Sequence, residues 1–291
     1  MARKIRVFAW VYSLVLVCFS AYVLLDTFAI GRVYQQVKPT EEVTEPVAPQ
    51  ITDSSYSDGN ITVTLTEYRE HNTAIYVADI RLASADYLKT ALAEGSYGRN
   101  IKQTTSEMAG ENGAILAVNG DYYGARDKGF VLRNGQLYRC DASDRQALVI
   151  DQNGDFQIVE ERRTDPEALV EAGVRQVLSF GPGLVTGGQI CVDRDTEVDQ
   201  ATHSNPRTAI AQVGELHYLL VVSDGRTDRS QGLTLYELAQ FLQQQGAVTA
   251  YNLDGGGSST MWFNGQVVNE PVNRGSKISE RRVSDIVYIG Y

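Results

Sequence analysis

Near the C-terminus, one carboxylate is followed directly by backbone without side chains and then by a run of hydroxyl groups. These residues are, in order, Asp254, Gly255, Gly256, Gly257, Ser258, Ser259 and Thr260. Because glycine has no Cβ and tolerates a positive φ, its main-chain N–H groups can approach a sugar or a phosphate closely. A flexible turn between two strands also explains three glycines. The carboxylate beside them adds a titratable group, which favours a ligand-binding or catalytic loop.

Three other junctions between an apolar run and a loop carry side chains of the same kinds. They hold Asn119 and Asp121; Asn205, Arg207 and Thr208; and Asp224 and Arg226, while Asn252 immediately precedes the glycine segment. Taken alone, each cluster is explained by turn chemistry, since Asn, Asp and Gly satisfy their own backbone in turns. Because all four junctions share this Asn, Asp and Arg chemistry, we predict that they meet in one site.

The histidines and the missing motifs narrow the chemistry. The sequence has three histidines, His71, His203 and His217, and no HExxH, GxSxG or Walker-type motif. It therefore gives no support to a zincin, a serine hydrolase or a P-loop nucleotidase. His217 lies within an apolar run and is interpreted as a packed core residue. His203, two residues before Asn205, is considered as a general acid or base, but the aspartates are stronger candidates.

The elements that must position these side chains are mostly strands. Residues 61–70 and 73–82 alternate in β-branched and aromatic residues around a polar His71-Asn72 pair, which predicts a hairpin. Asn-Gly pairs at 134–135, 153–154 and 264–265 predict three more hairpins. The middle of the chain is therefore expected to be largely antiparallel.

Further strands and helices are predicted around the candidate clusters. A capping box at Thr234 and Glu237 opens a helix through Gln245, with Gly246 at its end. Asp165 is a candidate cap for a short helix, and residues 104–112 are partly helical. Strands are expected at 114–118, at 205–213, at 215–226, at 250–253 and at 281–291.

The N-terminus is a separate segment. Arg3, Lys4 and Arg6 precede an uncharged run over 7–25, closed by Asp26. Nineteen helical residues reach about 28 Å, close to the ~30 Å hydrocarbon thickness of a bilayer. The run is long for a signal peptide and no clear cleavage site follows it, which favours an uncleaved single-pass anchor over secretion after cleavage. The basic flank predicts a cytoplasmic N-terminus and an extracellular domain.

Composition limits the class of protein. With 291 residues, 43% of them hydrophobic and 21% charged, the chain can bury a core, and its net charge of −10 argues against a nucleic-acid partner. Cys18 lies in the anchor. Cys140 and Cys191 have no metal-ligand spacing, and whether they form a disulfide stays open. We expect an anchor at 1–30, an extended linker at 31–58 and a catalytic domain at 59–291.

Several motifs together resemble the phosphodiester glycosidase family. They are NGDYYG at 119–124, SFGPGLV at 179–185, NPRTAI at 205–210, SDGR at 223–226, NLDGGGSSTM at 252–261 and RRVSDIVYIGY at 281–291. They occur in the family's order between about 110 and 291. Where family members commonly have Asn-Gly-Gly, this chain has Asp121 in place of the second glycine, which alters the expected pocket. The resemblance implies an α/β fold of mixed sheets with flanking helices, and hydrolysis of a sugar joined through its anomeric carbon to a phosphodiester.

The chemistry of that reaction assigns roles to the candidate residues. The leaving group is a phosphate monoester, a weak base, so its departure needs positive charge, which Arg207 with help from Arg226 can supply. A carboxylate must act on the sugar side, as a base for water or as a nucleophile, and Asp254 is the first candidate before Asp224 and Asp121. The groups expected to bind substrate are Asn119, Asn205, Thr208, Asn252, Gly255, Gly256, Gly257, Ser258 and Ser259.

A divalent cation stays an open alternative. Asp121, Asp224 and Asp254 with loop carbonyls have the oxygen chemistry that Ca²⁺ or Mg²⁺ prefers, but no EF-hand spacing occurs. We therefore predict a mixed α+β fold of largely antiparallel or mixed sheets with flanking helices and one transmembrane helix. The expected substrate is a sugar phosphodiester or a cell-surface glycopolymer. The alternatives are a non-catalytic carbohydrate-binding protein and an assembly protein of exopolysaccharide or envelope synthesis.

Overall fold

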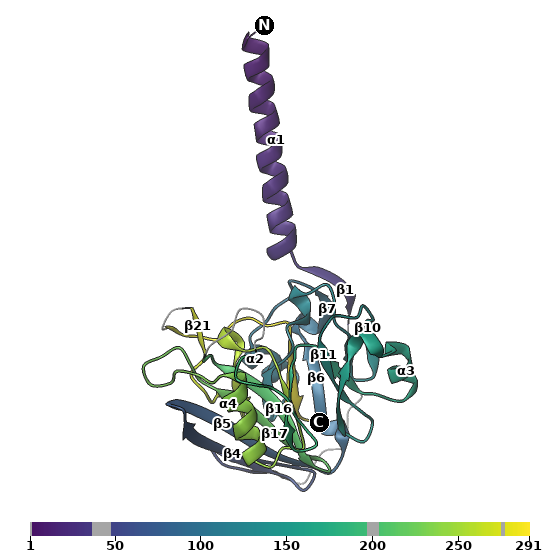
Figure 1. Ribbon diagram of the computed structural model, residues 1–291, viewed down its shortest axis with the longest axis vertical. Helices are drawn as coiled ribbons and strands as arrows, with labels where there is room; N and C mark the ends of the chain where they lie inside the picture. Colours follow the sequence, from purple (N-terminus) through teal and green to yellow (C-terminus); the bar gives the residue numbers. More distant parts are fainter. Residues whose placement is uncertain (1, 37–47, 197–203, 275–276) are drawn as a thin grey trace.

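The computed structural model describes residues 2–36, 48–196, 204–274 and 277–291. Helix α1 (Ala2–Phe28) projects from a domain built mainly of strands (Figure 1). Within α1, the window Trp10–Thr27 is long and apolar enough to cross a membrane, by length and composition. The helix therefore has the properties of a signal anchor or of a signal peptide.

The largest sheet has nine strands among the described residues, and all its pairings are antiparallel. Its order is β15 (Gln189–Ile190), β14 (Gly183–Thr186), β18 (Thr249–Asn252), β16 (Arg207–Gly214), β17 (His217–Ser223), β5 (Thr73–Leu82), β4 (Ile61–Glu70), β3 (Ser55–Ser57) and β2 (Gln50–Ile51). The predicted hairpin of β4 and β5 is confirmed. Both turn residues, His71 and Asn72, have φ of 50°, the left-handed geometry that suits a two-residue hairpin loop.

Two five-stranded sheets and two pairs of strands complete the domain in the described part of the chain. One contains, in order, β10 (Gln136–Arg139), β9 (Val131–Arg133), β13 (Gln176–Leu178), β11 (Gln146–Ile150) and β12 (Phe156–Glu160). The other contains β20 (Gln266–Val267), β19 (Met261–Phe263), β8 (Leu116–Asn119), β23 (Asp285–Ile289) and β6 (Leu88–Leu92). The three predicted Asn-Gly hairpins join β9 to β10, β11 to β12 and β19 to β20. One apolar core continues through all three sheets.

The predicted helices are confirmed. Helix α4 (Leu235–Gln244) begins at a capping box in which Thr234 accepts from the Glu237 N–H, and it buries Leu238 and Leu242. Asp165 caps α3 (Pro166–Glu171), and α2 (Thr105–Glu111) covers the partly helical stretch. The mixed α+β fold of antiparallel sheets with flanking helices is therefore as predicted.

The segment 31–58, expected as an extended linker, contains paired strands where it is described. Strand β1 (Arg32–Gln36) pairs with β7 (Ser96–Arg99), and β2 and β3 extend the edge of the large sheet. Tyr56 of β3 is buried and its hydroxyl donates to Asp58 at 2.5 Å. The folded domain thus begins by residue 50, because a buried aromatic side chain fixes this edge. Cys140 and Cys191 are exposed and unbridged.

Candidate active site

The four predicted junctions lie together where two sheets meet. Arg207 at the start of β16 pairs with Ser223 at the end of β17, and Ala209 pairs with Asn252 at the end of β18. These strand ends therefore share one end of the large sheet. Strand β8 of a different sheet ends beside them, since the Asn119 side chain donates to the Asp254 carbonyl at 2.6 Å.

Asn119 holds the glycine loop in place. Its Oδ1 accepts from the Thr208 hydroxyl at 2.8 Å and from the Thr260 N–H at 3.2 Å, and both side chains are fully buried. The Asp254 N–H in turn donates to the Gly120 carbonyl at 3.1 Å. Asn119 and Thr208, expected to bind substrate, thus use these polar atoms to join the two sheets and to position Asp254.

The carboxyl of Asp254 lies buried at the entrance to the glycine loop. Burial raises its pKa to about 6, while the neighbouring Ser258 hydroxyl and the charges of Arg281 and Arg126 limit the rise. Among the described residues, Asp254 Oδ2 and the Ser259 hydroxyl are buried with no partner in hydrogen-bond geometry. Buried polar atoms normally have partners, so these two atoms are suited to receive a ligand.

Two arginines lie directly against the loop, which continues through η5 (Gly256–Ser258). A Cβ on Gly256, whose φ is +62°, would lie 2.8 Å from Arg226 Nη2, and a Cβ on Gly257 would lie 2.6 Å from Arg281 Nη2. At such distances an added Cβ would force the guanidinium groups to move away. The glycines therefore allow two guanidinium groups to approach the backbone beside Asp254.

Arg207 adds a third positive charge behind the loop. It is buried, and its Nε donates to the Leu233 carbonyl at 2.9 Å. Burial and the charge of Arg226 lower the Arg207 pKa to about 10. Burial, and then the charge of Arg281, lower the pKa of Arg226. Arginines that depress each other's pKa create a positive potential, which favours an anionic ligand.

Arg126 and Arg281 are site residues that the sequence analysis missed. Arg126 follows η3 (Tyr123–Ala125), donates to the Ser179 carbonyl at 3.2 Å and lies 4.6 Å from the ring centre of Phe180. Arg281 donates to Asn273 at 3.2 Å. Each lies within or two residues after a family motif, so those motifs were the available signal.

Asp224 lies on the other side of the loop and has several donors. Its Oδ1 accepts from Asn269 and from the Glu270 N–H, both at 3.0 Å, and its Oδ2 accepts from Tyr76 at 3.3 Å. Asn269 also donates to the Ser259 carbonyl at 3.0 Å. Burial raises the Asp224 pKa. Asp224 thus positions the hydroxyl-rich end of the loop.

The two remaining amide candidates also make structural contacts. Asn252 donates to the Gly181 carbonyl at 2.8 Å, while its buried Oδ1 has no partner in the described ranges. Asn205 Oδ1 accepts from Arg226 Nη2 at 3.1 Å. Asn205 therefore orients one of the two arginines at the loop.

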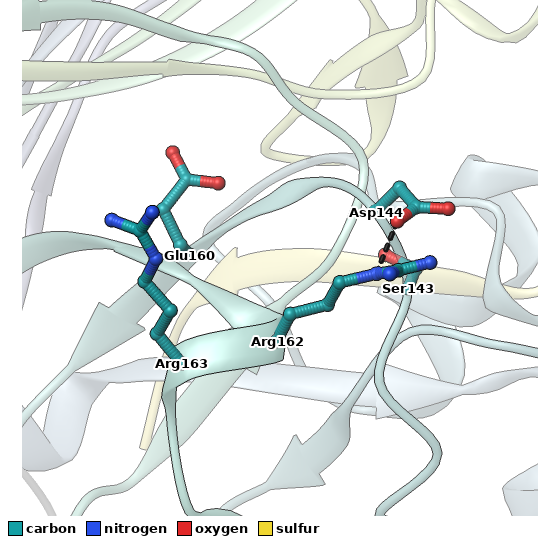
Figure 2. Close-up of a pocket in the computed structure, with 5 residues that line it drawn as sticks. All are labelled: Ser143, Asp144, Glu160, Arg162 and Arg163. Atoms are coloured by element: carbon teal, nitrogen blue, oxygen red, sulfur yellow. Dashed lines mark ion pairs between the residues drawn. The ribbon is translucent and has the colours of Figure 1, made fainter.

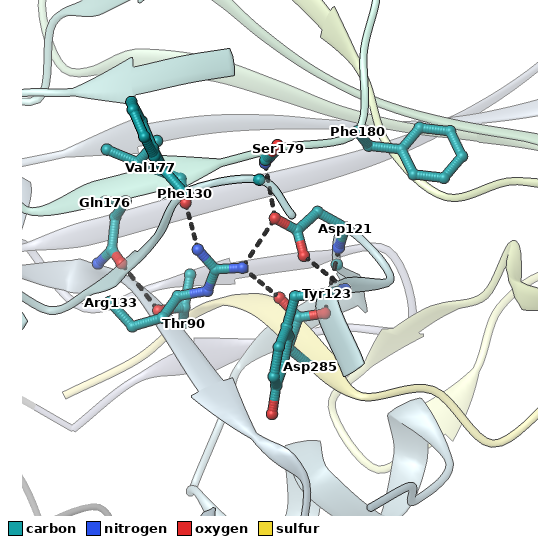
Figure 3. Close-up of polar contacts among 12 residues, drawn as sticks. Thr90, Asp121, Tyr123, Phe130, Arg133, Gln176, Val177, Ser179, Phe180 and Asp285 are labelled. Carbon is teal, nitrogen blue, oxygen red and sulfur yellow. Dashed lines mark hydrogen bonds and ion pairs between the residues drawn. The ribbon is translucent and has the colours of Figure 1, made fainter. Parts of the chain in front are cut away.

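Asp121 is not placed as a catalytic group, which corrects the sequence-based assignment (Figure 3). It is fully buried, and its Oδ2 lies 2.9 Å from Arg133 Nη2 and accepts from the Ser179 N–H at 2.6 Å. The same Arg133 nitrogen lies 2.9 Å from Asp285. Burial and the charge of Asp121 raise the Asp285 pKa to about 7. Both oxygens of Asp121 thus have partners inside the protein, since its Oδ1 accepts from the Tyr123 N–H at 3.1 Å.

The three aspartates proposed for a metal do not gather. Within the described residues, no group of three or more His, Cys, Asp or Glu side chains could hold a metal ion. His203 lies outside the described residues. His217 is half-buried, with Nε2 3.0 Å from Asp79 Oδ1, and not fully packed in the core as we had interpreted it.

A separate hollow of about 330 Å³ shares no residue with this site (Figure 2). It is lined by Ser143, Asp144, Glu160, Arg162 and Arg163. Arg162 is paired with Asp144. The carboxylate of Asp144 thus already balances part of the positive charge in this hollow.

Comparison with known proteins places this site in a family. The family model described as phosphodiester glycosidase matches residues 112–290. This stretch runs from just before Asn119 to the end of β23 and includes the glycine loop. The chain belongs to the phosphodiester glycosidase family. The match begins just before β8 and so contains both sheet ends that form the site.

The chain is similar to proteins of Bacillus subtilis and of animals. The SPbeta prophage-derived uncharacterized protein YomE of Bacillus subtilis (strain 168) is 28% identical over 213 residues, covering 71% of this chain and 32% of YomE. Mouse N-acetylglucosamine-1-phosphodiester alpha-N-acetylglucosaminidase is 30% identical over 196 residues, covering 61% and 37%. The chain thus spans about a third of the length of these two relatives.

A solved structure shares the fold. The zebrafish N-acetylglucosamine-1-phosphodiester alpha-N-acetylglucosaminidase catalytic domain, auto-inhibited by its pro-peptide, superposes with a TM-score of 0.65 at 20% identity. The likeness covers 90% of this chain and 88% of that one. The phosphodiester glycosidase fold therefore extends beyond the residues that the family model matches.

Proposed function

We propose that this chain is a hydrolase that cleaves the glycosidic bond of sugar-1-phosphodiesters and releases a free sugar and a phosphate monoester. The observation that carries the proposal is the juxtaposition of the buried Asp254 carboxyl with Arg226 and Arg281 across the glycine loop. The printed names of the mouse and zebrafish relatives describe this bond type and support the same substrate class.

The arginines act on the phosphate. As the glycosidic bond breaks, negative charge collects on the departing phosphate monoester. Arg226 and Arg281 lie against Gly256 and Gly257, where a phosphate bound to the loop would meet both guanidinium groups. Arg207 contributes its charge from behind the loop. Positive groups already in place lower the barrier at the point where charge develops.

Asp254 acts on the sugar as a general base. It removes a proton from water as the water oxygen bonds to the anomeric carbon, and the bond to the phosphate oxygen breaks with its electron pair leaving on the phosphate. Asp224 is held by Asn269, Glu270 and Tyr76, so it supports the loop and does not act as a second carboxylate. A weakly basic leaving group needs no acid.

The proposed location is outside the cytoplasm. Helix α1 carries Arg3, Lys4 and Arg6 before its apolar window at Trp10–Thr27, which favours a cytoplasmic N-terminus. The domain is then extracellular on a single-pass anchor. Its substrates are sugar phosphodiesters exposed at that face of the membrane.

The test measures sugar release by the full chain in detergent from UDP-sugars and from methyl diesters of several sugar-1-phosphates. We expect Asp254→Asn to reduce the rate at least about a hundredfold, the usual contribution of a general base. Asp53→Asn is the matched control, because Asp53 is exposed between β2 and β3 at the sheet edge. A rate unchanged in Asp254→Asn contradicts the assignment. Sugar binding without turnover supports the carbohydrate-binding alternative instead.

A further inference from the structure

The candidate site lies at the end of the domain that connects to α1. Asn119 at the end of β8 pairs with Ile286 of β23. The residue before Ile286, Asp285, pairs with Leu92 at the end of β6. Helix η2 (Ala93–Gly95) then leads directly into β7, which pairs with β1. In Figure 1, β7 lies where α1 leaves the domain, and β21 (Val272–Arg274), beside the glycine loop, lies in the same half.

The connection between α1 and the domain is short. Three residues, 29–31, separate Phe28 at the end of α1 from Arg32 at the start of β1. Three extended residues span at most about 11 Å. The Asn100 side chain also donates to the Thr27 carbonyl at 2.9 Å and to the Ile30 carbonyl at 3.3 Å. The domain is therefore held against the end of the helix.

The same β7 strand supports the loop that carries Arg126. The rings of Tyr97 and Tyr123 stack with centres 5.5 Å apart, and the Asn100 N–H donates to the Gly124 carbonyl at 3.2 Å. Arg99 forms an ion pair with Asp127 at 2.8 Å. A continuous set of contacts thus joins the end of α1 to Arg126, one of the groups whose charge limits the rise in the Asp254 pKa.

We infer that β1, β7 and Asn100 hold the site toward the membrane surface, and that its substrate is a lipid whose head group is a sugar-1-phosphodiester. This inference rests on the proposed function. A soluble substrate can diffuse into the site whichever way the site faces. A lipid head group can enter only a site that lies close to the bilayer and faces it. Fixed orientation raises the effective concentration of such a substrate at the site.

The experiment compares two substrates with the full chain in phosphatidylcholine vesicles. One is a sugar-1-phosphate esterified to diacylglycerol in the bilayer, and the other is the methyl ester of the same sugar-1-phosphate in solution. One variant carries twelve Gly-Ser residues inserted after Gly31. The second, Asn100→Gly, removes the amide but tolerates the local φ of 59°. Asn264→Gly is its matched control, an exposed left-handed Asn at the opposite end of β19 from the site.

We expect both variants to slow hydrolysis of the lipid, the insertion by about tenfold or more, while the methyl ester is hydrolysed at the wild-type rate. Asn264→Gly should leave both rates unchanged. Equal loss on both substrates, or no loss on either, overturns the orientation inference while the proposed function stands. If the wild type hydrolyses neither substrate, the proposed function itself fails and the inference fails with it.

Discussion

At the scale of single residues, the protonation of Asp254 follows from burial. Burial raises the pKa of the Asp254 carboxyl because it favours the neutral form, and the charges of Arg281 and Arg126 offset part of this rise. Asp121 shows the opposite use of burial, since Arg133 lies 2.9 Å from it and from Asp285. Burial thus gives Asp254 the raised pKa that the proposed proton transfer uses, whereas Asp121 joins two sheets through Arg133.

The first prediction concerns pH. Because a general base works only when ionised, kcat/KM on a soluble phosphodiester should rise with pH through about 6, the Asp254 pKa. A rate profile from pH 4.5 to 8 checks this, with Asp53→Asn expected to give the same curve. A rate that falls through pH 6 would instead make Asp254 a general acid.

The same group should influence stability with a definite sign. Its folded pKa is raised above the unfolded value of about 3.9, so the ionised carboxyl costs stability as pH rises from about 4 to 6, and the cost is complete above that. Asp254→Asn, which cannot ionise, should therefore have a higher Tm than the wild type at pH 8 and little advantage at pH 4. Thermal unfolding at both values measures it.

Residue chemistry was only partly predictable from the sequence. Asp254 directly precedes the glycine segment, and Arg226 was grouped with it because both strand-to-loop junctions share the same Asn, Asp and Arg chemistry. Arg126 and Arg281 reach the site from loops that are 128 and 27 residues away from Asp254 along the chain, and only their position within or just after a family motif hinted at a role. Asp121 was misassigned because its partner Arg133 lies on β9, in a different sheet.

At the scale of elements, the sequence predicted the hairpins and helices whose turns and caps are fixed by a few neighbouring residues. The Asn-Gly hairpins and the capped helices α3 and α4 form as the sequence predicts, because backbone geometry at two or three residues fixes them. The placement of β8 against the large sheet depends instead on Asn119, whose partners Thr208 and Thr260 are 89 and 141 residues away.

The same Gly→Ala substitution should have different effects in the glycine loop and in the exposed helix α2. At Gly257 a Cβ would meet Arg281 Nη2 at 2.6 Å, so Gly257→Ala should displace the guanidinium and reduce kcat/KM by about a hundredfold. Gly110 lies exposed in α2, with no atom within 4 Å of an added Cβ. Gly110→Ala should keep full activity and gain about 0.5–1 kcal/mol of stability.

Activity assays and thermal unfolding of the two purified variants measure both effects. Equal activity of Gly257→Ala and the wild type would contradict a role for Arg281 beside the loop. A loss of activity in Gly110→Ala would show that the comparison reports general damage.

At the scale of the whole molecule, the cysteines are divided between the apolar helix α1 and the folded domain. Cys18 lies within the apolar window of α1, and Cys140 and Cys191 are exposed on the domain. The two domain cysteines can therefore report the side of a membrane on which the domain lies.

A membrane-impermeant maleimide should label intact cells through Cys140 and Cys191 if the domain is extracellular, and the double variant Cys140→Ser/Cys191→Ser should lose the signal. Mass shift of the purified protein measures the labelling. Labelling that requires permeabilised cells would reverse the proposed topology. Recovery of the domain from the medium would support cleavage after α1.

The large sheet ends on both sides in strands of two residues, β15 at Gln189–Ile190 and β2 at Gln50–Ile51. Long exposed edge strands are templates for pairing between molecules, and very short ones offer few free backbone groups. On the membrane anchor proposed for α1, copies of the protein meet often in two dimensions. The short outer strands then oppose edge-to-edge polymerisation, so that crowding brings separate domains together without joining their sheets.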